Sequence, residues 1–326
     1  MTKPLFTMAA QAYDRLQPLF DGRVQLGGAR LNCLDLPVEE TFARTVAHQE
    51  FDIAELSLSS YVLTLSRGAP FVAVPVFPSR AFRHSAVYVR ADSQVTDPAQ
   101  LAGGTIGVPE YQITAAVWVR GILAEHHGLP VTSVRYRTGG LDAPGRVEKI
   151  PLDLPADVDV APIGPGQTLS QLLLDGQLDA VYSARNPGPL GAGIRRLFTD
   201  APMVEADYFA RTGIFPPMHT LVIRRDVHEQ HPWLARELVK ACARAKQLGL
   251  AGTGETAALR FALPWLWAEV ERTERALGPD WWPYGLERNQ TALETFLRYS
   301  HEQGLAARRY EPAELFAPAS LTEVVV

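Results

Sequence analysis

Apolar and polar positions follow a strand-then-helix order along the first half of the chain. Residues 4–13 form an apolar run that predicts a first strand, and residues 37–49 place apolar side chains at helical spacing. Residues 51–58 are nearly continuously apolar, as in a strand of a parallel sheet that helices cover on both faces. This order predicts an α/β fold built on parallel sheets.

The same order continues to about residue 227, and the chain is mostly helical from Pro232 onward. Further strands are expected at 71–77, 84–90, 131–137 and 158–163, with others ending near Val108 and Ser183 and a returning strand within 212–227. Helices are expected to end at Gly128 and Gly176 and to occupy 262–277 and 289–304.

Two of the expected strands end in polar residues. These clusters are Ser57, Ser59, Ser60 and Tyr61, and Ser183, Arg185 and Asn186. In parallel α/β sheets, ligands bind beyond the carboxyl ends of strands, where helix N-termini offer free N–H groups. We therefore expect the two clusters to face each other across a cleft between two lobes, with chain crossings near 78–84 and 208–219.

Composition limits the classes of partner. The chain has 326 residues, 47% of them apolar, and a net charge of −5 with no basic cluster, which argues against nucleic acid and anionic lipid. No stretch approaches eighteen consecutive apolar residues, so no membrane span is expected. The N-terminus has no signal-peptide core, and Cys33 and Cys242 have no disulfide or zinc spacing, so we expect a cytoplasmic protein.

Familiar cofactor motifs are absent from the sequence. There is no G-x-G-x-x-G after a first strand, no P-loop, no G-x-S-x-G, no H-E-x-x-H and no cysteine-based metal pattern. We therefore expect neither an organic cofactor nor a metal. The expected partner is a small molecule, and a homo-oligomer is compatible with the sequence.

The segment PSRAFRHS, residues 78–85, concentrates polar groups between two apolar strands. Arg80 and Arg83 would suit a substrate with more than one carboxylate, because guanidinium groups bind carboxylates bidentately. The alternative is a solvated loop between strands. His84 and His219 each stand at the head of a strand, where they could transfer protons near neutral pH or serve as hydrogen-bonded structural residues.

A further group of polar residues precedes the helix that begins near Thr114. Glu110, Tyr111 and Gln112 would line the second lobe's side of the cleft, with Glu110 as an acid or base, or they would only cap the helix. Glu55 lies inside an apolar strand, where a buried carboxylate needs a partner. We expect that partner to be an arginine and the role of Glu55 to be structural.

Six long blocks of the sequence carry a family resemblance. They are LPVEETFARTVAHQEFDIAELSLSSY, PVFPSRAFRHSAVYV, GVPEYQITAAVWVRGIL, IGPGQTLSQLLLDGQLDAVYSARNP, RTGIFPPMHTLVIRRDV and WWPYGLERNQTALETFLRYSHEQGL. From about residue 5 to about residue 320, the chain resembles the 4,5-dihydroxyphthalate decarboxylase family. The resemblance implies a two-lobed type II periplasmic-binding-protein-like fold, with a ligand cleft between the lobes and a helical C-terminal region. Lobe I would comprise residues 1–88 and 211–326, and lobe II residues 89–210.

The resemblance also implies conversion of 4,5-dihydroxyphthalate to protocatechuate and carbon dioxide. Protonation of the ring carbon that bears the departing carboxylate, with deprotonation of the para hydroxyl, avoids an aryl anion. This route needs an acid, a base and cations for two neighbouring carboxylates.

The residues described above are assigned to these roles as a hypothesis. Arg80, Arg83 and Arg185 would bind carboxylates, His84 or His219 would donate the proton, and Glu110 or the other histidine would act on the phenol. Hydroxyl and helix-end contacts would come from Ser57, Ser59, Ser60, Tyr111 and Thr114.

Three other functions remain open at the level of sequence. The chain could be a solute-binding protein for an aromatic or dicarboxylic acid, although it lacks a secretion signal. It could be a ligand-sensing regulatory domain, although no helix-turn-helix segment precedes the first strand. It could also be an enzyme that acts on a different hydroxy-aryl acid.

Overall fold

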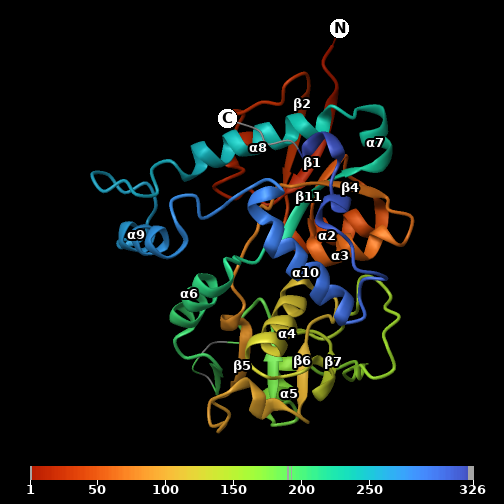
Figure 1. The fold of residues 1–326 in the computed structure, drawn as a ribbon, viewed down its shortest axis with the longest axis vertical. Helices are drawn as coiled ribbons and strands as arrows, with labels where there is room; N and C mark the ends of the chain where they lie inside the picture. Colours follow the sequence, from red (N-terminus) through yellow and green to blue (C-terminus); the bar gives the residue numbers. More distant parts are fainter. Residues whose placement is uncertain (1, 189–190, 192, 322–326) are drawn as a thin grey trace.

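Two separate β-sheets form the cores of two α/β lobes, which lie one above the other in Figure 1. The computed structural model describes residues 2–188, 191 and 193–321. Ten helices and eleven strands lie in this described part of the chain, and the predicted α/β class is confirmed.

The first sheet has the strand order β2-β1-β3-β11-β4. Its strands are β1 (Leu5–Ala10), β2 (Arg30–Asp35), β3 (Ile53–Ser57), β4 (Phe71–Val74) and β11 (His219–Arg224). Strands β1, β2 and β3 are parallel, whereas β11 returns antiparallel between β3 and β4. Because β11 reverses direction, His219 at its start lies opposite Ser57 at the end of β3.

Helices cover both faces of this sheet, which explains the continuous apolar pattern of its central strands. They are α1 (Gln17–Phe20), α2 (Val38–His48), α3 (Leu58–Leu65), α7 (Arg225–Gln230) and α8 (Leu234–Leu250). Every residue of β3 is buried, whereas β2 at the edge alternates between exposed and partly buried residues.

The second sheet has the strand order β10-β5-β9-β6-β7-β8. Its strands are β5 (Val87–Arg90), β6 (Thr105–Val108), β7 (Arg135–Thr138), β8 (Val160–Pro162), β9 (Ala180–Tyr182) and β10 (Ile194–Arg196). Its helices are α4 (Thr114–His126) and α5 (Leu169–Leu174). The parallel pairs β9–β6 and β6–β7 point their carboxyl ends toward the first lobe's helix α3.

Between β1 and β11, the chain crosses from one sheet to the other twice. Residues 75–86 connect β4 to β5, and α6 (Ala201–Thr212) lies on the return from β10 to β11. Strand β5 begins at Val87 after a short 3₁₀ turn at His84–Ala86, so it spans the boundary expected at residue 88.

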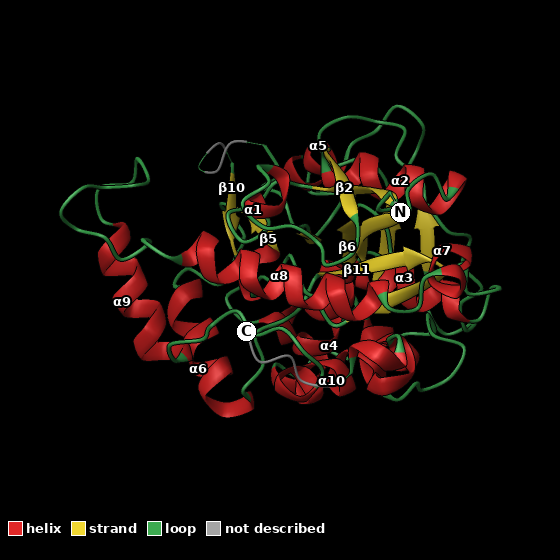
Figure 2. Cartoon of the chain, turned by 90° about the horizontal axis from the view of Figure 1, so that it is seen from above, coloured by secondary structure: helices red, strands yellow, loops and turns green. Residues whose placement is uncertain are grey.

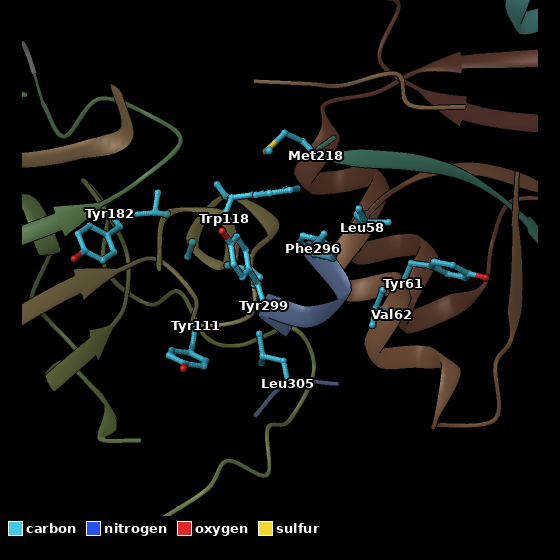
Figure 3. Packing of buried hydrophobic residues seen from close by; sticks show 14 of the residues in the cluster. Leu58, Tyr61, Val62, Tyr111, Trp118, Tyr182, Met218, Phe296, Tyr299 and Leu305 are labelled. Carbon is cyan, nitrogen blue, oxygen red and sulfur yellow. The ribbon is translucent and has the colours of Figure 1, made fainter. Parts of the chain in front are cut away.

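The C-terminal region is helical, as expected, and its two helices behave differently. Helix α10 (Gln290–Glu302) packs on α4, where Phe296 and Tyr299 lie against Trp118 with ring centroids 5.5 and 5.8 Å away (Figure 3). Helix α9 (Leu266–Leu277) projects from the body beside α6 (Figures 1 and 2), and all its residues stay at least partly exposed.

Short 3₁₀ helices complete the described fold. In addition to the turn before β5, they lie at Pro98–Leu101, Val131–Ser133, Glu287–Asn289, Pro312–Leu315 and Pro318–Ser320. None of the helices traced for residues 2–188, 191 and 193–321 combines the length and the apolar character that crossing a bilayer requires.

Candidate active site between the lobes

A cavity of about 190 Å³ lies between the two lobes. Lobe I supplies helix α2, the end of β3 and the start of β11, and lobe II supplies the N-terminus of α4 and the loops around 141–149 and 183–185. The predicted meeting of the two polar strand ends is therefore found in the structure, since Ser57 and Ser183 both line this cavity. Phe42 and Ile113 add an apolar wall that suits an aromatic ring.

Four cations surround the cavity, namely Arg83, Arg146, Lys149 and Arg185. Two carboxylates, Glu39 and Glu110, lie among these cations. The site therefore has two positive charges without a matching carboxylate, if the separate ion pair between Glu55 and His219 is left aside. A dianionic ligand would supply the missing charges.

Arg83 is the one of these four cations that forms no ion pair with a carboxylate in the described part of the chain. Its Nε atom lies 3.1 Å from Sδ of Met218, a weak acceptor, and no acceptor in the described chain bonds to its two terminal nitrogens. Burial lowers the pKa of Arg83 to about 10, so the guanidinium is still charged at neutral pH. An uncompensated guanidinium at a cavity wall is a binding group for a carboxylate.

Glu110 has a different environment from the one expected of an acid or base. Its side chain is buried and accepts hydrogen bonds from Arg146 Nε at 2.8 Å, Gln112 Nε2 at 3.1 Å and the Lys149 N–H at 3.1 Å, and it also contacts Lys149 Nζ. Cationic and amide donors thus occupy both oxygens of the carboxylate. Glu110 therefore anchors two cations that line the cavity, and it does not itself line the cavity.

His219 lines the cavity and is held by Glu55. Its Nδ1 atom lies 2.6 Å from Oε1 of Glu55, and its ring packs edge-on against Phe42 with centroids 4.8 Å apart. Because Nδ1 donates to the carboxylate, Nε2 is the nitrogen available to a ligand. The expected arginine partner of Glu55 is wrong: histidine and tyrosine side chains take that place.

Hydroxyl and amide groups from the two lobes bond directly to each other. Ser57 Oγ lies 2.8 Å from Thr114 Oγ1, and Ser60 Oγ donates to Gln112 Oε1 at 3.0 Å. Thr114 Oγ1 also accepts the N–H of Ser59 at 3.0 Å. These contacts tie the start of α3 to the start of α4 and satisfy the N–H of Ser59 in the first turn of α3.

The start of α4 stays open to a ligand. The N–H groups of Thr114 and Ala115 are the first two of the helix and have no carbonyl acceptor within it. Both residues line the cavity. Their N–H groups, together with the positive end of the helix dipole, favour an anion at this place.

Five of the predicted site residues do not line the cavity. Glu110 and Ser59 bond to residues that line it, whereas the other three, Arg80, Tyr111 and His84, do not. Arg80 is buried and donates to the carbonyl oxygens of Phe215 and Pro283 and to Asn289, so its charge serves the interlobe connection. Tyr111 is buried, and its hydroxyl donates to the carbonyl of Gln303 at 3.3 Å.

His84 is the third of these residues. It packs among aromatic rings, with His127, Phe198 and Tyr208 at centroid distances of 5.6, 5.4 and 5.1 Å. It is 1% exposed, and neither ring nitrogen has a hydrogen-bond partner within the described residues. Burial lowers its pKa to about 3, which leaves a neutral ring that is unsuited to proton transfer at neutral pH.

Sequence reasoning missed several groups that line the cavity. Arg146 and Lys149 come from the glycine- and proline-rich loop after β7, and Glu39 comes from the first turn of α2. The available signal was charge in a loop that follows a strand of a parallel sheet, at the edge where ligands bind. Only the folded chain shows that these charges converge on Glu110.

No group of three or more His, Cys, Asp or Glu side chains among the residues with described positions is arranged to hold a metal ion. Most polar groups at the cavity wall are arginine, lysine, hydroxyl and amide groups, which bind oxyanions.

Comparison with known proteins relates the whole chain to two curated enzymes. It is 43% identical over 325 residues to a 4,5-dihydroxyphthalate decarboxylase of Comamonas testosteroni, covering 98% of each chain. It is 44% identical over 213 residues to a 4,5-dihydroxyphthalate decarboxylase of Pseudomonas putida, covering 64% of this chain and 83% of the relative. No family model matches the sequence.

Among solved structures, the periplasmic aliphatic sulphonate binding protein SsuA of Escherichia coli has a similar fold. The TM-score is 0.55 at 12% sequence identity, and the match covers 97% of this chain and 98% of SsuA. The expected periplasmic-binding-protein-like fold is therefore confirmed, and at this identity the likeness concerns the fold alone.

Proposed function

The chain belongs to the 4,5-dihydroxyphthalate decarboxylase family, and we propose that it converts 4,5-dihydroxyphthalate, or a closely related hydroxy-aryl dicarboxylate, to carbon dioxide and the aromatic monocarboxylate. For 4,5-dihydroxyphthalate the product is protocatechuate. The observation that supports this proposal most directly is the 43% sequence identity to a curated decarboxylase, over 98% of both chains. The uncompensated positive charge of the interlobe cavity agrees with a dianionic aromatic substrate.

The retained carboxylate is assigned to Arg83 and to the free N–H groups at the start of α4. A guanidinium on the departing carboxylate would stabilise the ground state and slow the reaction, so the strong clamp belongs on the group that stays. Arg185, whose side chain is 69% exposed, stands at the mouth of the cavity and adds positive charge there. The aromatic ring would lie against Phe42 and Ile113.

The reaction proceeds through protonation of the ring. The hydroxyl para to the departing carboxylate loses its proton, the ring carbon that bears this carboxylate gains one, and a dienone forms. The carbon–carboxylate bond then breaks, its electron pair returns to the ring and the phenolate oxygen, and carbon dioxide leaves as aromaticity is restored. No aryl anion is formed in these steps.

His219 is assigned as the acid that protonates the ring carbon. It is the imidazole at the cavity wall, and Glu55 holds it so that Nε2 faces the ligand. At the other end of the cavity, Arg146 and Lys149 would stabilise the phenolate oxygen, and Glu39 is the ionised carboxylate that would accept the phenol proton. Burial alone would raise the pKa of Glu39, but Arg146, Arg185 and Lys149 together outweigh burial and hold this pKa below its usual range.

We place this reaction in the cytoplasm, where Cys33 and Cys242, both free thiols, would remain reduced. A homo-oligomer is part of the same proposal, without an assigned interface.

A second candidate is a solute-binding protein without catalysis, which the SsuA-like fold makes worth testing. Purified protein is incubated with 4,5-dihydroxyphthalate, and carbon dioxide and protocatechuate are measured together. Equal amounts of the two products support the enzyme. Phthalate, which carries both carboxylates but no hydroxyl, serves as the control and should bind without turnover. Tight binding of 4,5-dihydroxyphthalate without carbon dioxide release would instead identify a solute receptor.

A further inference from the structure

Tyr13 lies outside the cavity but contacts the residue that holds His219. It follows strand β1, at the carboxyl end of the first sheet, and it does not line the cavity. Its hydroxyl donates to Oε1 of Glu55 at 2.9 Å, the same oxygen that Nδ1 of His219 approaches to 2.6 Å. One carboxylate oxygen therefore contacts both the tyrosine hydroxyl and the imidazole.

The Glu55 carboxylate is fully enclosed by this arrangement. It is 0% exposed, and its second oxygen accepts the N–H of Gln11 at 3.2 Å. A buried carboxylate with three hydrogen-bonding neighbours is held in one orientation. Tyr13 stays protonated as its donor, because burial and then the charge of Glu55 raise the pKa of the phenol.

Tyr13 is held in place by packing as well as by its hydrogen bond to Glu55. The guanidinium of Arg15 lies 4.2 Å from the centre of the Tyr13 ring and 4.1 Å from the centre of the Trp282 ring. Nε of Arg15 donates to the carbonyl of Pro78 at 2.6 Å, in the segment that connects the lobes. The tyrosine is thus placed by the first sheet, by the crossing segment and by the C-terminal region.

We propose that Tyr13 is a positioning residue for the proton donor, because its hydroxyl holds Glu55 against Nδ1 of His219 and limits how strongly Glu55 retains the imidazolium. This inference rests on the proposed function, in which His219 protonates the ring carbon. With two donors on one oxygen, the carboxylate shares its charge between them. Without the tyrosine, all of that charge would act on His219, which would become a weaker acid.

Other charged groups around His219 would be unchanged by removal of the Tyr13 hydroxyl. From the elements that surround the cavity, they are Glu39, Arg83, Arg146, Lys149 and Arg185. Arg15 is the cation against Tyr13 itself. A change in the titration of His219 in the variant can therefore be attributed to the Tyr13 hydroxyl.

The test is Tyr13→Phe, which removes one oxygen atom and leaves the ring in place. We expect kcat to fall about tenfold, which is the loss of one charge-assisted hydrogen bond. We expect KM to stay within a factor of two, since Tyr13 does not line the cavity. The pH profile of kcat and the NMR titration of the His219 ring should both move up by about 0.5 to 1 pH unit.

Two further variants separate this role from a structural one. Glu55→Gln removes the counter-ion, so the His219 titration should move down, opposite to the change in Tyr13→Phe. Tyr182→Phe is the matched control, because Tyr182 is a buried tyrosine whose hydroxyl has no partner in the described chain. This control should leave the His219 titration and kcat unchanged.

The results distinguish the inference from the proposed function. Suppose that the wild-type protein catalyses the reaction, and that Tyr13→Phe matches Tyr182→Phe in kcat, in the pH profile of kcat and in the NMR titration of His219. The proposed role of Tyr13 is then wrong, and the proposed function stands. A rise in KM alone would also overturn the role, since it would show a purely structural effect. If wild-type protein shows no turnover, the proposed function fails, and the NMR titration still reports whether Tyr13 acts on His219.

Discussion

Nε of Arg146 lies 2.8 Å from Oε1 of Glu110, so a buried carboxylate holds a cation at the wall of the interlobe cavity. Glu110 binds Lys149 in the same way. Glu110 therefore influences the charge of the site in two ways. It holds two cations at the cavity, and it neutralises part of their positive charge.

Glu110→Gln should therefore lower stability without changing the protonation steps of the reaction. Loss of the buried charge leaves Arg146 and Lys149 without their main counter-ion, which should reduce the free energy of unfolding by about 2 to 4 kcal/mol. The pH profile of kcat should keep its shape. Denaturant unfolding and the pH profile check these results, and Glu50→Gln, in the exposed pair with Arg44, is the control. If kcat of Glu110→Gln no longer rose or fell with pH where kcat of the wild-type protein does, Glu110 would be a group that exchanges a proton during the reaction.

Removal of Arg83 should weaken substrate binding, whereas removal of Arg80 should lower the stability of the fold. Arg83→Ala should raise KM for a dicarboxylate about 100-fold at nearly unchanged stability, because it removes an uncompensated cation from the cavity wall. Arg80→Ala should instead lower the free energy of unfolding by about 3 kcal/mol, since it removes a buried side chain and its hydrogen bonds to the Phe215 carbonyl, the Pro283 carbonyl and Asn289. Steady-state kinetics and denaturant unfolding of both variants check this contrast. If Arg80→Ala raised KM and Arg83→Ala lowered stability, Arg80 would be the residue that binds the carboxylate.

The proposed chemistry predicts which carboxylate leaves an unsymmetrical substrate. In 4-hydroxyphthalate only one carboxylate has a hydroxyl in the para position, so only that carboxylate should leave. The product should be 3-hydroxybenzoate, free of 4-hydroxybenzoate, as chromatography of the products can show. Formation of 4-hydroxybenzoate would contradict ring protonation directed by the para hydroxyl.

His84 should make the fold sensitive to acid. Its pKa is lowered to about 3 by burial, so below about pH 6.5 the unfolded chain binds a proton that the folded chain refuses. The free energy of unfolding should thus decrease as pH falls from 6.5 toward 3, with a contribution from His84 of about 2 kcal/mol at pH 5.

His84→Phe should remove this part of the pH dependence, because phenylalanine suits the surrounding aromatic rings and does not titrate. Denaturant unfolding at pH 7 and pH 5 measures the effect, with His48→Phe on the exposed end of α2 as the control. Equal losses of stability in wild-type protein and His84→Phe between the two pH values would contradict this role.

The sequence predicts the architecture better than it predicts the site. Continuous apolar strands such as 51–58 and the helix that ends near Gly128 are set by local pattern, and both are present as β3 and α4. Strand β2 was missed because it lies at an edge and has a largely polar, half-exposed pattern. The expected strand at 131–137 begins later, after a 3₁₀ turn, because Val131–Ser133 turns before it enters the sheet.

The roles of single polar residues depend on tertiary contacts that no local pattern contains. Arg80 and Arg83 are three positions apart, yet one is bound by backbone carbonyls and the other faces the cavity. The sequence places both His84 and His219 at the head of a strand, but His84 lies in the 3₁₀ turn before β5, and only His219 begins its strand. His219 meets a carboxylate because β11 runs antiparallel beside β3.

The central claim is that this cavity decarboxylates its ligand by means of His219. The most direct measurement compares wild-type protein with His219→Asn, recording carbon dioxide and protocatechuate from 4,5-dihydroxyphthalate and binding of the same compound by calorimetry. The wild-type protein should form the two products in equal amounts, and the variant should bind with similar affinity but turn over about 100- to 10,000-fold more slowly. A variant that keeps the wild-type rate, or a wild-type protein that binds without releasing carbon dioxide, would contradict the claim.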